Sequence, residues 1–385
     1  MSGFSNATDG DFDRVFTTTS EIISRFVGSK VWTWGKDNYG QLGDNTVVNK
    51  STPIQTVAGG TNWKQLACGY THAAAIKTDG TLWLWGWGVY GQLGDNTTTS
   101  KSSPVQTISG GLNWSQVACG YYHTAAIKTD GTLWVWGDNT FGGLGTNNTT
   151  RLSSPVQTIT GGTNWKQVVC GKYTTTAIKT DGTLWSCGYN DRGQLGDGTL
   201  VNRSSPVQVY GAGINWSSLA STSYTTAAIK TDGTLWSWGY NGNGELGDNS
   251  TTNRSSPVQT IAGGTNWKSI QRGTYHTAAI KTDGTLWMWG NNQFGQLGNN
   301  TTTTISSPVQ TVTGGTNWMR VSCGGYTTAA IKTDGTLWSW GRNESGQLGD
   351  NTIVNKSSPV QNTAGGINWK QLSCGVNGYT SAIGE

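Results

Sequence analysis

Six cysteines and three histidines are the side chains of this chain best suited to ligate a metal or to act as a nucleophile or base. Nearly all of them recur at fixed positions of an internal repeat: Cys68, Cys119, Cys170, Cys323 and Cys374 share one position, and His72, His123 and His276 share another. Neither set has the C-x-x-C or H-x-x-x-H spacing that is typical of a zinc site. We therefore predict no metal site and no other cofactor.

The regular spacing of these residues favours structural roles. Equivalent positions of neighbouring repeats should lie farther apart than the roughly 4.4–6.8 Å between the Cα atoms of a disulfide. We therefore predict that the repeated cysteines, and Cys187 at a different position, are small buried side chains. Thr174, Thr225 and Thr327 stand at the histidine position in other copies, which predicts a structural hydrogen bond within each repeat.

Catalysis by a nucleophile requires a base and an orienting acid beside it. No Ser, His and Asp cluster stands apart from the repeated background, and the Gly-rich loops recur in every copy without a helix after them. We predict that the protein is not an enzyme and has no catalytic residues.

The repeat itself sets the architecture. The string IKTDGTLW begins at Ile76 and recurs every 51 residues, six times in all, and a W-x-W-G element occurs seven times, with Cys187 in place of its second Trp once. Asp-Gly between two β-prone runs predicts a hairpin with a two-residue type I′ turn. The seven prolines share one repeat position, where they would open an edge strand. Each repeat is therefore expected to form four short antiparallel strands.

Such a sheet would have two apolar faces, with Trp83 and Trp85 on one and Leu82 and Leu84 on the other. Radial stacking of the sheets would cover both faces. The chain begins and ends halfway through a repeat. We therefore predict an all-β, seven-bladed β-propeller of four-stranded antiparallel blades over residues 30–385, in which residues 30–59 and 366–385 share one blade and close the ring.

The motifs W-x-W-G, G-Q-L-G-D, S-P-V-Q and V-x-C-G-x-x-H-T-A-A-I resemble the regulator of chromosome condensation repeat over residues 30–385. The resemblance implies the seven-bladed propeller. The sequence departs from the motif where Ser221 and Arg272 replace the cysteine. Members of this family include a nucleotide exchange factor for a small GTPase and a bacterial β-lactamase inhibitor, so the resemblance implies a fold more firmly than a function.

The two ends of the blades differ in how much they vary among the copies. We assume that the strands run from the axis outward in sequence order. The turns K-T-D-G and G-G-x-N-W then share one face and barely vary, which predicts solvated structural turns with largely self-compensating charges; a ring that binds an anionic partner is the alternative.

The other face carries the short C-G-x-Y loops and the long loops after W-x-W-G, which do vary. Aromatic and arginine side chains on loops of a rigid scaffold are typical of binding hot spots. Tyr39, Tyr90, Phe141 and Phe294 share one position, and the alternative for them is packing beneath the loop. Neutral drift of loop sequences is the alternative for the whole face. The predicted binding residues are Tyr70, Trp87, Tyr121, Lys172, Tyr189, Arg192, Tyr240, Arg342 and Glu344.

Residues 1–29 lie outside the repeats and form a predicted N-terminal extension. Residues 20–28 fit a short helix, with Ser20 as N-cap and Gly28 after its end. One hypothesis is a segment that docks onto a larger assembly; the other is a loosely packed lead-in.

The amino-acid composition limits the classes of partner that we expect. Charged residues make up 12% of the chain, against roughly 25% in a typical domain, and the net charge is +4. We therefore expect no nucleic acid partner, and no apolar run is long enough for a membrane span. The expected ligand is a protein or a glycan on the variable face.

Three function classes follow. The predicted one is a structural or adhesive component of a phage virion or surface assembly, located on a virion or an extracellular surface without a Sec signal. The alternatives are a soluble inhibitor or interaction module, and an exchange factor or chromatin adaptor, with a cytoplasmic location as the alternative.

Overall fold

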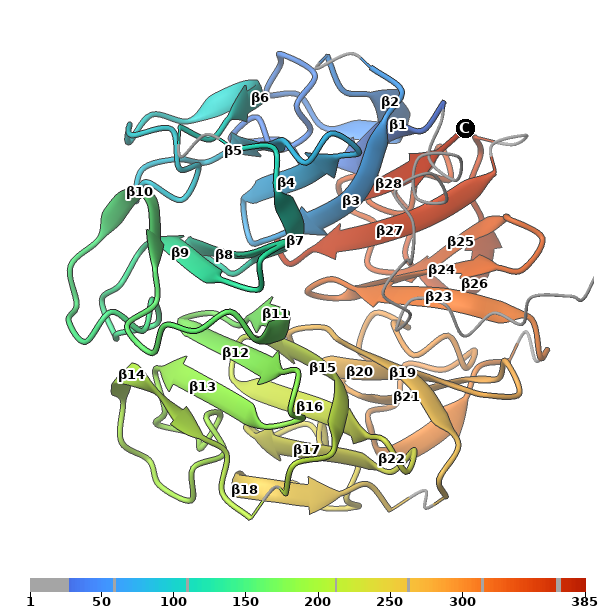
Figure 1. The fold of residues 1–385 in the computed structure, drawn as a ribbon. Helices are drawn as coiled ribbons and strands as arrows, with labels where there is room; N and C mark the ends of the chain where they lie inside the picture. Colours follow the sequence, from blue (N-terminus) through green and yellow to red (C-terminus); the bar gives the residue numbers. More distant parts are fainter. Residues whose placement is uncertain are drawn as a thin grey trace, which may run out of the picture.

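The computed structural model describes residues 28–385 apart from residues 58–59, 109–110, 212, 262–263, 313–314 and 365–367. The described residues form 28 β-strands in seven four-stranded sheets, and no helix. The sheets are arranged radially like the blades of a propeller (Figure 1). The predicted all-β, seven-bladed fold is confirmed.

Six blades are each built from four consecutive strands, which run from the axis outward. In the first of them, β3 (Trp63–Cys68) is innermost and is followed by β4 (His72–Lys77), β5 (Leu82–Gly86) and β6 (Lys101–Gln106). The next five blades are β7 (Trp114–Cys119), β8 (His123–Lys128), β9 (Leu133–Gly137) and β10 (Leu152–Gln157); β11 (Trp165–Cys170), β12 (Thr174–Lys179), β13 (Leu184–Gly188) and β14 (Arg203–Gln208); β15 (Trp216–Thr222), β16 (Thr225–Lys230), β17 (Leu235–Gly239) and β18 (Arg254–Gln259); β19 (Trp267–Arg272), β20 (His276–Lys281), β21 (Leu286–Gly290) and β22 (Ile305–Gln310); and β23 (Trp318–Cys323), β24 (Thr327–Lys332), β25 (Leu337–Gly341) and β26 (Lys356–Gln361).

The seventh blade joins the two ends of the described chain. Its strand order is β27 (Trp369–Gly375), β28 (Tyr379–Gly384), β1 (Lys30–Gly35) and β2 (Lys50–Gln55). Strands β28 and β1 pair antiparallel along their whole length, from Lys30 opposite Gly384 to Gly35 opposite Tyr379. The predicted closure of the ring by N- and C-terminal strands is confirmed.

The Asp-Gly hairpin does not use the predicted type I′ turn. In the first copy Gly80 has a φ of 81°, whereas Asp79 does not have a positive φ. The amide of Gly80 donates to the carbonyl of Lys77, and the amide of Lys77 donates to that of Thr81. This is a three-residue loop with glycine in the left-handed region. The longer loop forms because the Asp79 carboxylate accepts hydrogen bonds from both the amide and the hydroxyl of Thr81.

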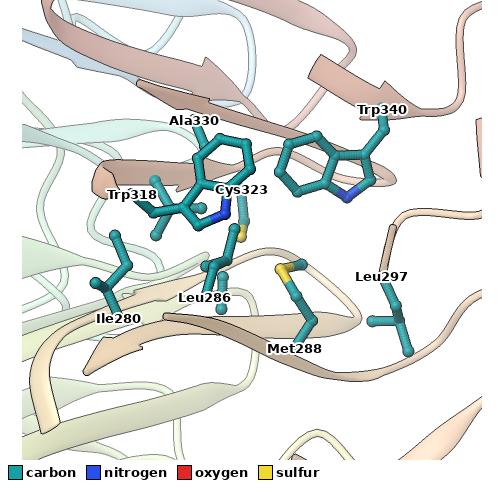
Figure 2. Packing of buried hydrophobic residues seen from close by; sticks show 10 residues of the cluster. Ile280, Leu286, Met288, Leu297, Trp318, Cys323, Ala330 and Trp340 are labelled. Atoms are coloured by element: carbon teal, nitrogen blue, oxygen red, sulfur yellow. The ribbon is translucent and has the colours of Figure 1, made fainter. Parts of the chain in front are cut away.

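Apolar side chains fill the space between neighbouring blades. Trp83 and Trp85 contact one interblade cluster, and Leu82 and Leu84 belong to the next, as predicted. Figure 2 shows one such layer, in which Met288 of β21 faces Trp340 of β25. The buried indole N–H of Trp340 also donates to the carbonyl of Gln296, in the preceding blade, at 2.9 Å. In each blade that carries it, the second Trp of W-x-W-G therefore hydrogen-bonds to the preceding blade.

The histidines link different blades, which corrects the predicted hydrogen bond within a blade. His72 Nε2 lies 3.0 Å from the Thr124 hydroxyl, and the pairs His123–Thr175 and His276–Thr328 repeat this contact. The contact crosses blades because β4 and β8, which carry His72 and Thr124, occupy equivalent places in neighbouring sheets. All three rings are fully buried, and burial lowers the pKa of His72 to about 3.

Candidate interaction face

The short and long loops meet on one face, as predicted from the strand order. In the first blade the amide of Trp87, which opens the long loop, donates to the carbonyl of Thr71 in the short loop at 2.8 Å. The same bond joins Tyr189 to Tyr173, Tyr240 to Tyr224 and Arg342 to Tyr326. A rigid backbone framework therefore positions the variable side chains.

A chain of aromatic contacts crosses this face, from the long loop between β1 and β2 to the short loop between β15 and β16. Tyr39 stacks on Trp87 with ring centroids 5.5 Å apart, and Trp87 meets Tyr122 at 5.5 Å. Tyr122 contacts Tyr173, which packs with Phe141 and Tyr189, and Tyr189 reaches Tyr224. We call this set, with Tyr70 and Tyr90, the aromatic belt. Its long-loop rings are not packed away beneath the loops, since Tyr39 is 42% exposed and Tyr90 and Phe141 are half-buried.

Three rings of the belt, Tyr122, Tyr173 and Tyr224, were not predicted from the sequence. Tyr122, Tyr173, Tyr224, Tyr275 and Tyr326 occupy one repeat position in five blades, and a search for residues that vary between copies passes over them. Burial raises the pKa of Tyr122 and of Tyr326 to about 12, so both hydroxyls stay neutral hydrogen-bonding groups. The signal that could have found them is an aromatic residue on a loop, where the fold itself does not require one.

Two predicted binding residues reach from the face toward the axis of the ring. Tyr121 is only 8% exposed; its hydroxyl lies 2.5 Å from that of Ser223 and 3.3 Å from that of Thr274, in two other blades. The half-buried Lys172 donates to the Tyr224 hydroxyl at 2.8 Å, and its ammonium lies 5.8 Å from the centre of the Tyr121 ring. The Tyr121 ring reaches hydroxyls of two other blades across the centre of the ring, and its role in binding stays a prediction.

The remaining predicted residues lie at the surface. Tyr70 stacks on Tyr121 with ring centroids 4.7 Å apart, and Tyr240 is half-buried. Arg192 is exposed and pairs with its neighbour Asp191 at 3.4 Å. Arg342 forms an ion pair with the exposed Glu344, and its guanidinium lies 5.2 Å from the centre of the Phe294 ring.

A pocket of about 250 Å³ opens beside Tyr121. Tyr70, Tyr121, Tyr275 and Tyr326 supply aromatic walls, and Lys36 and Arg342 supply cations. The Lys36 ammonium donates to the Asn377 side chain at 3.3 Å. None of the residues described as lining this pocket carries a carboxylate, so the pocket suits a ligand with an apolar or aromatic group next to a negative charge.

On the opposite face the predicted structural turns are present, but their lysines pack on tryptophan rings. Each K-T-D-G lysine lies between two tryptophan rings of its own blade; the Lys128 ammonium is 5.0 Å from the centre of the Trp114 ring and 4.2 Å from that of Trp134. The aspartates are held by the threonines of their own turns, as Asp130 is by Thr132. Within the described ranges, no ion pair joins the lysine and aspartate of one turn. The tryptophan faces attract the ammonium groups. The pKa of Asp130 is lowered mainly by the hydrogen bonds from Thr132 and also by the charge of Lys128, so the turn charges still compensate one another.

Among the residues with a described position, no cluster of three or more His, Cys, Asp or Glu could hold a metal, and no helix could cross a membrane. The six cysteines, all in the described part, are free thiols. The predicted extension falls almost wholly on residues 1–27, which lie outside the described residues, so docking through that segment stays a prediction.

The sequence matches known families along nearly all of the propeller. The RCC1-like domain matches residues 19–262, and the regulator of chromosome condensation (RCC1) repeat matches residues 283–331 and 334–380. This chain belongs to the RCC1 repeat family. Family members bind partner proteins or act as exchange factors more often than they catalyse reactions.

Several RCC1-family relatives are similar along much of the chain. The ultraviolet-B receptor UVR8 of Arabidopsis thaliana is 30% identical over 88% of this chain and 79% of the receptor. The mitochondrial RCC1 domain-containing protein RUG3 of the same plant is 31% identical over 71% of this chain and 64% of RUG3. The human E3 ubiquitin-protein ligase HERC2 is 33% identical over 66% of this chain, and the matched part is only 5% of HERC2.

Solved structures share the RCC1 fold at lower identity. Prp20p from Saccharomyces cerevisiae has a TM-score of 0.86 at 19% identity, with 100% of this chain and 96% of Prp20p covered. Human WBSCR16 has a TM-score of 0.82 at 22% identity, with 93% and 99% covered.

Proposed function

We propose that this RCC1-family propeller is a scaffold that binds a protein partner on its variable-loop face. The aromatic belt is the observation that carries the proposal. Its rings are half-buried against one another, so a partner can cover large apolar surfaces whose side chains are already ordered. Contacts made by such side chains lose little conformational entropy on binding.

The pocket beside Tyr121 indicates the chemistry of the partner. Its tyrosine walls fit an apolar or aromatic side chain, while Lys36 and Arg342 favour a carboxylate next to it. Glu344 pairs with Arg342 at the rim. When an acidic group enters, it would either displace Glu344 from Arg342 or share the Arg342 guanidinium with it. We infer that the partner presents an acidic residue beside an apolar anchor.

The relatives support the general function and not its finer versions. Prp20p, which has this fold, has binding properties to Gsp1p and histones. Its likeness is one of fold at 19% identity, so nucleotide exchange is not part of the proposal. The relatives reported above give no support to a virion role or to a glycan ligand, and both stay predictions from the sequence.

Affinity capture with paired variants tests the proposal. Trp87→Ala and Arg342→Ala change the variable-loop face, and Leu112→Ser changes a side chain of the opposite end that is 67% exposed. A protein partner bound by the wild type and by Leu112→Ser, and bound at least tenfold more weakly by the two face variants, would support the proposal. Equal binding by all four proteins, or loss only in Leu112→Ser, would contradict it.

A further inference from the structure

A second, smaller cavity of about 100 Å³ lies on the axis of the ring. Tyr121 and Val376 line both this cavity and the surface pocket, so they form the partition between the two. Seven equivalent positions, one from the inner strand of each blade, line the axial cavity: Cys68, Cys119, Cys170, Ser221, Arg272, Cys323 and Cys374.

Arg272 is the cation among these seven residues, and it is only 3% exposed. Its Nη1 donates to the Glu245 carbonyl at 2.7 Å and to the Thr277 hydroxyl. Its Nε and Nη2 have no hydrogen-bond partner within the described structure. A buried guanidinium has five N–H donors and is costly to leave unsatisfied, so these atoms point to a missing acceptor.

The surrounding residues do not supply that acceptor. Burial holds the pKa of the cysteine thiols that line the cavity, such as Cys323 and Cys374, above the usual range, so these thiols remain neutral. Glu245 replaces the glutamine of most copies and is fully buried, but its carboxylate accepts hydrogen bonds from the amide and side chain of Asn243. Glu245 therefore leaves the free donors of Arg272 unsatisfied, and burial raises the pKa of the Glu245 carboxyl, which weakens its compensation of the Arg272 charge.

We propose that the axial cavity is a binding site for one small inorganic anion of halide size, held by Arg272 Nε and Nη2. A charge-assisted hydrogen bond favours an anion over a neutral water at these two donors. The volume of about 100 Å³ admits a halide with its remaining hydration. The bound anion would join residues contributed by several blades at the centre of the ring.

Bromide locates the site directly. Crystals of the wild-type chain grown in sodium bromide should show an anomalous scattering peak within hydrogen-bond distance of Arg272 Nε and Nη2. Water at these atoms, with no anomalous peak, would overturn the proposal. This measurement needs no variant, so it holds even where a substitution in the axial ring disturbs folding.

A titration measures the same site in solution. Bromide replaces gluconate, a much larger organic anion, at constant ionic strength. The melting temperature of the wild type should rise by about 2 °C for each tenfold increase in bromide above the dissociation constant.

The variant E245Q/R272C gives both positions the residues of other copies and should lose the bromide dependence. Arg192→Gln removes an exposed arginine and should keep it. An equal bromide response in the wild type and in E245Q/R272C would overturn the site.

Discussion

Replacing the same tryptophan in two neighbouring blades should destabilise the protein by different amounts. The indole of Trp85 donates to the Gln41 carbonyl, and that of Trp136 donates to the Gln92 carbonyl, each at 2.9 Å. Both tryptophans are fully buried. The Thr124 hydroxyl also donates to the Gln92 carbonyl at 2.8 Å. Ala73 stands at the position equivalent to Thr124 and offers the Gln41 carbonyl no second donor.

Phenylalanine at either site removes the indole N–H and a similar part of the ring, so these shared losses cancel in the comparison. Trp136→Phe leaves the Gln92 carbonyl bonded to Thr124, whereas Trp85→Phe leaves the Gln41 carbonyl buried without a partner. An unsatisfied buried acceptor costs about 1–3 kcal/mol beyond the lost bond. We therefore expect Trp85→Phe to lower the free energy of unfolding by about 2 kcal/mol more than Trp136→Phe, a factor of about 30 in the unfolding equilibrium.

Urea denaturation of the two variants and the wild type, followed by far-ultraviolet circular dichroism, measures this difference. Adding Thr124→Val to Trp136→Phe removes the second donor and also the hydroxyl that His72 contacts, so the loss of the double variant should reach or exceed that of Trp85→Phe. Equal losses for the two single variants, or a larger loss for Trp136→Phe, would refute the argument that these carbonyls are satisfied only from the neighbouring blade.

Three further perturbations follow from the buried groups. Burial lowers the pKa of His276 to about 3, so between pH 6.5 and pH 3 the unfolded chain binds a proton that the folded chain does not, and the free energy of unfolding should fall on acidification. His276→Thr should remove about 1.4 kcal/mol per pH unit of this dependence between pH 6 and pH 4. An unchanged slope of the unfolding free energy would contradict the assignment. Burial raises the pKa of Cys187 and of Cys374 to about 12, so neither thiol should react with Ellman's reagent at pH 8 before unfolding, whereas all six cysteines should react in denaturant; fast labelling of either in the native state would count against their burial. Lys128→Met removes the ammonium from between Trp114 and Trp134 and should lower the free energy of unfolding, measured in urea, by about 1 kcal/mol. An unchanged free energy of unfolding would show that this cation–π contact does not stabilise the blade.

The sequence predicted the blades because a 51-residue repeat of four short strands has two apolar faces that radial stacking covers. It did not predict the hydrogen bonds between blades. His72 and Thr124 lie 52 positions apart, and their hydrogen bond depends on the angle and separation of two sheets. The sequence likewise does not show that each K-T-D-G lysine packs between tryptophans, because those tryptophans come from two other strands of its blade.

The seventh blade illustrates a compensation that the sequence alone does not explain. Tyr379 takes the place of the repeated histidine, and its hydroxyl donates to the His72 carbonyl of the next blade at 2.5 Å. The larger ring packs in the same cluster as Ala73, where most copies carry threonine. The two departures from the repeat are adjacent in space and over 300 residues apart along the chain.

Hydrogen exchange of the chain with and without its captured protein partner tests the central claim that the aromatic belt is the binding surface. We predict that binding slows exchange in the short loops that carry Tyr70, Tyr122 and Tyr173 and in the long loop that opens at Trp87. Exchange in the K-T-D-G turns should not change. Protection confined to those turns, with the belt loops exchanging as in the free protein, would contradict the account.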